Sequence, residues 1–165
     1  MAVVTRSRTT TGAGVLAILI LVLAFGNPAY SEWADRHAKG NNTWDLLLRT
    51  LAWPRWFLTP GNLPNKDVIA YDLRALLLVV FVALILGLAG AAVAGAMGGF
   101  ILGWFAVIFG GAVAALLTAF ITTQASLYNA LLAAGGGSVY GLYVGWIIGL
   151  VTAATRRSAG VAATV

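Results

Sequence analysis

The fold of this chain is decided by one uncharged stretch, which runs from Ala75 to Thr155 and reads ALLLVVFVALILGLAGAAVAGAMGGFILGWFAVIFGGAVAALLTAFITTQASLYNALLAAGGGSVYGLYVGWIIGLVTAAT. A helix that crosses a bilayer needs about 17–25 residues. Two such spans would leave too much apolar loop, and four would leave no room for the turns. We therefore expect three transmembrane helices within residues 75–155.

The composition of the whole chain supports a membrane environment. Hydrophobic residues make up 61% of the 165 residues and charged residues only 9%, whereas soluble domains average about 25% charged residues. A water-soluble domain of this size could neither bury so much apolar surface nor cover itself with so few charges. The sequence thus argues against soluble globular and disordered proteins and predicts an all-α integral membrane protein.

Three spans can be placed within the uncharged stretch. The first covers Ala75–Val93 and contains twelve Leu, Ile, Val or Phe residues, which together favour insertion by about −4 to −7 kcal/mol. The glycine-rich segment Gly95–Gly99 is the expected turn. The second span then covers about 99–121, and the third covers 138–155 and ends before two arginines.

The N-terminal segment allows two interpretations. Residues 9–31 carry no charge, but the dense apolar part is only 13–25, which is the length of a signal-peptide core preceded by Arg6 and Arg8. A cleavage site at 29–31 would fit that interpretation. We instead expect a retained transmembrane helix over 9–31, which makes the fold a four-transmembrane-helix bundle.

The charges suggest an orientation. All five acidic residues lie in the loop 32–74, whereas the tails 1–8 and 156–165 carry only arginines. The loop holds six Lys and Arg against four in the tails, which conflicts with a simple count of positive charges. Because the tail arginines lie close to the spans and the loop is long, we expect both tails to be cytoplasmic. The loop is then extracytoplasmic, and the protein a multi-pass protein of the cell (plasma) membrane.

The loop contains a predicted interfacial helix at about 43–53. Its apolar residues recur with helical spacing, Asp45 and Arg49 are placed to form an i,i+4 ion pair, and Pro54 ends the helix. Indole rings prefer the headgroup layer of a membrane. This segment is therefore either a membrane-surface anchor or a docking surface for a partner protein. The residues expected to serve either role are Trp44, Leu48, Trp53, Trp56 and Phe57.

Glycines recur every four residues in two of the spans and thus form stripes along helices. Such stripes allow two helix backbones to approach closely. They serve either packing against the chain's own spans or association between copies, and both interpretations remain open at this point. The predicted helix-packing residues are Gly137, Gly141, Gly145, Gly149, Gly99 and Gly103.

The sequence offers little for catalysis. It has no Cys and one His, and we find no nucleotide-binding, metalloprotease or hydrolase motif. Glu32, Asp35 and His37 are the best acid–base cluster, but the neighbouring Arg36 and Lys39 favour solvated ion pairs. We expect no enzymatic activity, no cofactor, no metal and no nucleic-acid partner.

These features favour a small non-catalytic membrane protein. We expect an accessory or assembly subunit of a larger membrane complex, or a homo-oligomer that associates through its glycine-rich helix faces. The expected partners are the lipid bilayer and other membrane subunits or further copies of the chain. The alternative is an oligomeric pore or carrier for a neutral or lipid-like solute. A membrane enzyme that uses the loop carboxylates is a third hypothesis.

Overall fold

A computed structural model describes residues 2–58 and 63–161, and all regular secondary structure in this part is α-helical. The six helices are α1 (Ala2–Phe25), α2 (Pro28–His37), α3 (Thr43–Leu51), α4 (Asn65–Ala89), α5 (Gly95–Ala119) and α6 (Leu127–Val161). Three of them, α4, α5 and the part of α6 up to Arg156, are long and apolar enough to cross a membrane. A fourth span results if α1 and α2 count as one bent segment. The described residues are therefore all-helical in their regular secondary structure, with three to four helices compatible with a multi-pass membrane protein.

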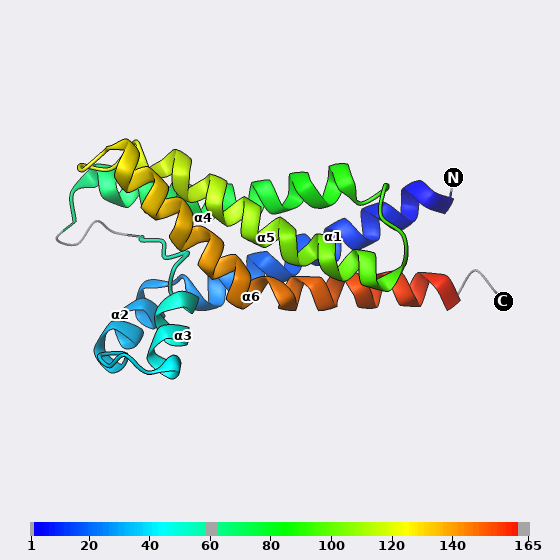
Figure 1. Cartoon of the computed structure of the whole chain (residues 1–165), viewed down its shortest axis with the longest axis horizontal. Coiled ribbons are helices and arrows are strands. Elements are labelled where there is room, and N and C mark those ends of the chain that lie inside the picture. The colour runs from blue at the N-terminus through cyan, green and yellow to red at the C-terminus, as the bar shows by residue number, and fades with distance from the viewer. Residues whose placement is uncertain (1, 59–62, 162–165) are drawn as a thin grey trace.

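The four long helices α1, α4, α5 and α6 lie side by side along the longest axis of the molecule (Figure 1). The beginning of α1 and the end of α6 lie at the same end of this bundle, as an even number of crossings requires. The short helices α2 and α3 lie at the opposite end, beside the bundle axis. We refer to these two short helices as the α2–α3 unit.

The first span differs from the predicted continuous helix over 9–31. Helix α1 ends at Phe25, and the chain bends by 60° before α2 begins at Pro28. The reason is local: the side chain of Asn27 accepts a hydrogen bond from the backbone N–H of Tyr30 at 2.9 Å and thus caps α2. Proline at the first position of a helix suits a new helix and not the continuation of an old one.

The other helix boundaries also differ from the predicted ones. Helix α4 begins at Asn65, well before the predicted Ala75, so charged residues lie within its first turns. The turn to α5 covers residues 90–94 and not Gly95–Gly99. Helix α6 begins at Leu127 and not at residue 138. Helix α4 begins before the uncharged stretch, and its polar side chains Asp67 and Arg74 form hydrogen bonds with Thr123 and Trp53.

The core of the bundle is apolar and filled by side chains from all four long helices. Its largest fully buried members include Ile18, Leu78, Leu86, Tyr140 and Ile148. The face of α5 inside the bundle consists mainly of Gly and Ala, which brings the backbones of α5 and α6 close together. A second, small cluster joins α2 to α3 and is formed by Ala34, Ala38, Leu48 and Ala52.

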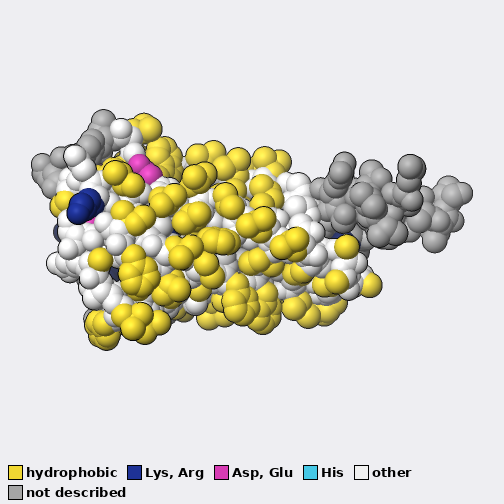
Figure 2. All heavy atoms as spheres, turned by 90° about the horizontal axis from the view of Figure 1, so that it is seen from above, with side chains coloured by type: hydrophobic (Ala, Val, Ile, Leu, Met, Phe, Trp, Pro, Cys, Tyr) yellow, Lys and Arg dark blue, Asp and Glu magenta, His cyan; other side chains and the backbone are white. Residues whose placement is uncertain are grey.

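The outer surface of the bundle is apolar along its length. Figure 2 shows hydrophobic side chains over most of the visible face and acidic side chains only near one end. Large residues such as Leu88, Phe109 and Leu131 are exposed on α4, α5 and α6. An apolar surface of this extent fits contact with lipid chains and not with water.

Candidate functional site

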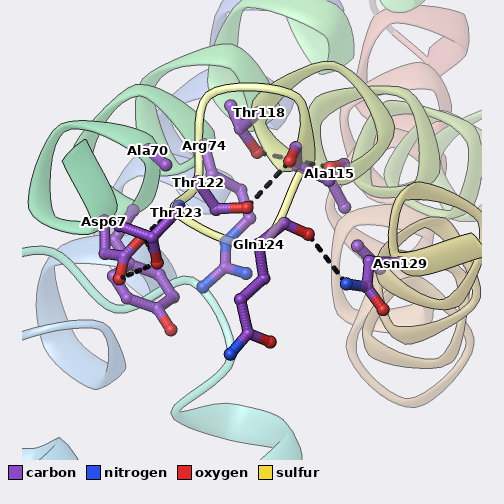
Figure 3. Close-up of a pocket in the computed structure, with 12 residues that line it drawn as sticks. Asp67, Ala70, Arg74, Ala115, Thr118, Thr122, Thr123, Gln124 and Asn129 are labelled. Atoms are coloured by element: carbon purple, nitrogen blue, oxygen red, sulfur yellow. Dashed lines mark hydrogen bonds between the residues drawn. The ribbon is translucent and has the colours of Figure 1, made fainter. Parts of the chain in front are cut away.

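A polar pocket lies where the first turns of α4 meet the end of α5 and the start of α6. Its volume is about 330 Å³, which is within the range of small-ligand sites. Figure 3 shows Asp67 and Thr123 on one side of this pocket and Asn129 on the other. The lining residues are Asp67, Ala70, Tyr71, Arg74, Ala115, Thr118, Ala119, Thr122, Thr123, Gln124, Asn129 and Ala133. We call this site the α4–α6 pocket.

Helix α4 contributes the charged and aromatic residues of the pocket. Asp67, Tyr71 and Arg74 follow one another at i, i+4 and i+7, so their side chains leave the same face of the helix. Asp67 lies in the first turn, where a negative charge is favoured by the helix dipole. The helical spacing alone therefore places an acid, a phenol and a guanidinium along one wall.

Arg74 makes aromatic contacts in place of an ion pair. The centre of its guanidinium group lies 4.7 Å from the ring centroid of Trp53 and 4.7 Å from that of Tyr71. Its Nη2 donates a hydrogen bond to the backbone carbonyl of Trp53 at 3.0 Å, and its Nε is buried without a hydrogen-bond partner. Cation–π contacts stabilise a guanidinium by about 0.5–2 kcal/mol each, but they leave its charge in place.

All five acidic side chains of the chain are described, and each has other partners. Glu32 and Asp35 lie 3.9 and 3.4 Å from guanidinium nitrogens of Arg36 and Arg55, while Asp45, Asp67 and Asp72 accept hydrogen bonds from backbone N–H groups of Gly40, Thr123 and Phe57. None of them forms a salt bridge with Arg74 within the described residues. The pocket therefore contains a cation that has no acidic side chain within salt-bridge distance among the described residues.

The opposite wall comes from the connection between α5 and α6. Asp67 accepts hydrogen bonds from the backbone N–H and the hydroxyl of Thr123, at 2.9 and 3.1 Å. The side-chain amide of Asn129 donates to the backbone carbonyl of Gln124 at 2.8 Å. By contrast, the side chain of Gln124 is exposed and makes no hydrogen bond among the described residues. These contacts fasten the α5–α6 connection to α4 and leave one amide group open at the pocket.

The predicted helix-packing glycines all lie at the contact between α5 and α6. A Cβ atom on Gly149 would lie 2.7 Å from the carbonyl oxygen of Phe100, and one on Gly145 would lie 2.8 Å from that of Trp104. Equivalent close contacts surround the other four, Gly137, Gly141, Gly99 and Gly103. The glycine stripes are thus occupied by helices of the same chain.

The predicted interfacial residues fall into two groups. Trp44 is exposed on α3, with 64% of its surface accessible. The other four contact the chain itself. Leu48 lies in the cluster between α2 and α3, Trp53 stacks on Tyr140, Trp56 donates its indole N–H to the carbonyl of Val22, and Phe57 contacts Tyr71. The aromatic segment after α3 therefore packs along the end of the bundle.

Of the predicted polar pairs, Glu32 and Arg36 form the expected exposed ion pair, whereas the pair on α3 is absent among the described residues. Asp45 and Arg49 do not pair within the described residues; Arg49 donates instead to the carbonyl of Ala38, with an Nε–O distance of 2.6 Å. On α2, the Nδ1 atom of His37 lies 2.8 Å from the carbonyl oxygen of Trp33, and the two rings stack. No group of three possible metal-ligating side chains occurs in the described part of the chain.

The α4–α6 pocket was not predicted from the sequence. With the helix expected to begin at Ala75, Arg74 was placed in the loop, and its i, i+4, i+7 spacing with Asp67 and Tyr71 gained meaning only once α4 began at Asn65. The contribution of Trp53 and of the α5–α6 connection has no local signal in the sequence. No protein-family model, curated protein or solved structure matches this chain significantly.

Proposed function

We propose that this chain is a non-catalytic protein of the cell membrane that acts as an accessory or assembly subunit, with both termini in the cytoplasm. In this proposal, the α2–α3 unit is the surface that contacts another membrane protein. The observation that carries the proposal is the exposure of large apolar side chains on this unit. Trp33, Trp44 and Leu46 are 41%, 64% and 47% exposed.

The α2–α3 unit presents these side chains on a surface of defined shape. Leu48 is buried between α2 and α3, and the hydroxyl of Tyr30 donates to the carbonyl of Leu48 at 3.4 Å. Asp35 pairs with Arg55, which fastens α2 to the segment after α3. A surface that is already ordered loses less conformational entropy on binding than a flexible loop does.

The same unit carries charges that are exposed to solvent. Glu32 and Arg36 are largely exposed and lie one helical turn from each other. Exposed ion pairs of this kind favour contact with water over burial among lipid chains. Tryptophan beside charged groups is typical of binding hot spots between proteins, so a partner at the membrane surface explains the exposed rings.

The glycine stripes do not supply this contact, because α5 and α6 already pack through them. Association between copies of the chain would therefore need another surface. The proposed partner surface and the helix-packing surface are therefore formed by different residues, and each can be changed by its own substitution.

Site-specific photo-crosslinking in the native membrane tests the proposal. A photoreactive phenylalanine analogue replaces Trp44 in one variant and Leu88, which is exposed on α4, in the control variant. We expect a discrete protein adduct from position 44 and only lipid adducts from position 88. An adduct of twice the chain mass would identify a second copy as the partner. Lipid adducts alone from both positions would contradict the proposal and favour a membrane-surface anchor.

A carrier for a lipid-like solute is the second candidate, and the α4–α6 pocket favours it. Because the centre of the bundle is filled by apolar side chains, a path for such a solute would have to run along the outside of a chain or between several chains. Transfer of a fluorescent lipid between the leaflets of liposomes that contain only this protein tests this candidate. Transfer at the rate of protein-free liposomes would exclude it.

A further inference from the structure

Arg74 forms no salt bridge within the described residues. It belongs to a helix long and apolar enough to cross a membrane, and all five acidic side chains have other partners. A charged group in such a helix is costly unless it is paired or reaches water or a headgroup. The two aromatic rings near Arg74 stabilise the cation without neutralising it.

The pocket offers several hydrogen-bond donors in addition to the charge. Only Nη2 of the Arg74 guanidinium has a hydrogen bond in the structure, to Trp53, although the group carries five N–H donors. The Tyr71 hydroxyl and the Gln124 amide line the same pocket and make no hydrogen bonds among the described residues. A guanidinium together with neutral donors matches the planar, multi-oxygen shape of a phosphate group.

Asp67 limits which anion fits. Its carboxylate lines the pocket, but both of its oxygen atoms accept hydrogen bonds from Thr123. It lies seven residues from Arg74, which corresponds to about 10 Å along the helix axis. A polyphosphate would approach this carboxylate and be repelled, whereas a single phosphate can lie at Arg74 with an uncharged or cationic substituent toward Asp67.

The position of the pocket points to a lipid as the source of this phosphate. Arg74 lies nine residues after the start of α4, or about 14 Å along the axis. Next to it lie Trp53 and Tyr71, and such aromatic rings prefer the depth of the lipid headgroups. Gln124 in the α5–α6 connection and Asn129 in the first turn of α6 line the same pocket, and both lie outside the apolar part of α5. A headgroup phosphate is abundant at this depth.

We propose that the α4–α6 pocket binds the single phosphate of a lipid headgroup, with Arg74 as the anion-binding residue and Tyr71 and Gln124 as additional donors. This assignment is independent of the partner surface on the α2–α3 unit, because it involves neither α2 nor α3. A substitution that abolishes phosphate binding in the pocket would leave crosslinking from position 44 unchanged. Failure of the phosphate site can therefore be distinguished from failure of the partner surface.

Calorimetric titration of the full chain in an uncharged detergent tests the site. The probes are dihexanoyl phosphatidylglycerol, the phosphate-free dihexanoylglycerol and inorganic phosphate. We expect saturable binding of the first, no binding of the second and at least tenfold weaker binding of the third. If dihexanoylglycerol bound as tightly as dihexanoyl phosphatidylglycerol, the proposal would be overturned. If inorganic phosphate bound as tightly, the phosphate would not have to come from a lipid, and that part of the proposal would be overturned.

Four variants assign the binding to the pocket. We expect Arg74→Gln to weaken binding of the phospholipid at least tenfold, and Arg36→Gln, which removes the cation of an exposed ion pair on α2, to leave it unchanged. Ala133→Leu fills the pocket while Arg74 remains, and it should weaken binding to a similar extent. Its control is Gly135→Leu, at a position on α6 that faces open space. Unchanged binding in Ala133→Leu would overturn the assignment even if Arg74→Gln failed to fold.

Discussion

The hydroxyl group of Thr152 on α6 donates a hydrogen bond to the backbone carbonyl of Gly99 on α5, with an oxygen–oxygen distance of 2.6 Å. Thr152 is 1% exposed, and the same hydroxyl also lies within hydrogen-bond distance of the carbonyls of Ile148 and Gly149 on its own helix. Because Gly99 has no side chain, the two helices come close enough for this contact. The glycine stripe thus allows a polar bond between helices as well as dispersion contacts.

Replacement of Thr152 by valine should lower the free energy of unfolding by about 0.6 kcal/mol, the average for hydrogen bonds between membrane helices, and by no more than about 1.7 kcal/mol. Valine keeps the shape of threonine and removes only the donor. Reversible unfolding in mixed micelles measures the change. The matched control is Thr155→Val, because the hydroxyl of Thr155 bonds only to carbonyls of its own helix, Val151 and Thr152. Equal effects of the two substitutions would show that the bond to Gly99 contributes nothing.

Replacement of Gly103 by alanine should destabilise the bundle by about 1–3 kcal/mol, because overpacking forces backbones apart. The new Cβ would lie 2.9 Å from the Cα of Gly149 and 2.9 Å from the carbonyl oxygen of Ile148, and backbone atoms cannot rotate away. Gly87→Ala on α4 is the control, since a Cβ there meets nothing within 4 Å. Thermal unfolding in detergent compares the two. A melting temperature of the Gly103 variant at or above that of the control would refute close packing at this position.

Arg156 joins the cytoplasmic end of α6, in the proposed orientation, to the turn between α4 and α5. Its Nη2 donates to the carbonyl of Gly90 at 2.7 Å, and its Nη1 donates to that of Val93. These carbonyls lie at and beyond the end of α4, where helices leave acceptors unsatisfied. We expect Arg156→Gln to speed amide hydrogen exchange of the turn, residues 90–94, at least tenfold while exchange at the core of α5 stays unchanged. Arg36→Gln, at an exposed ion pair on α2, should leave exchange of that turn as it is.

The membrane class and the helical composition could be predicted from the sequence because they depend on a bulk property, the uncharged stretch. The helix boundaries depend on individual contacts. Helix α4 begins at Asn65, before the predicted start at Ala75. Its first turns are held by hydrogen bonds of Asp67 with Thr123 and of Arg74 with Trp53, residues that are distant in sequence. By contrast, the bend before Pro28 is indicated locally by the Asn27–Pro28 pair, which is typical of the start of a new helix.

The contacts of the candidate site, like the helix boundaries, could be predicted only in part from the sequence. The glycine positions were predictable because helical periodicity is local, but the choice between packing within the chain and packing between chains was not. Trp53 was predicted to lie among the headgroups or to contact a partner, and its stacking on Tyr140, with ring centroids 5.2 Å apart, was not predicted. Contacts between residues so far apart in the chain depend on the tertiary arrangement and leave no pattern in a single sequence.

The two connections at opposite ends of the bundle should face opposite sides of the membrane. Ala92 lies in the turn between α4 and α5, and Ala125 lies in the turn between α5 and α6; both are exposed. Because the chain has no native cysteine, a single cysteine at either position reports its side without background. With both termini cytoplasmic, a membrane-impermeant maleimide added to intact cells should label Ala125→Cys at once and Ala92→Cys only after permeabilisation. The reverse labelling pattern would show that the orientation is opposite to the proposed one. Labelling of both cysteines from outside would contradict the proposal that α5 spans the membrane.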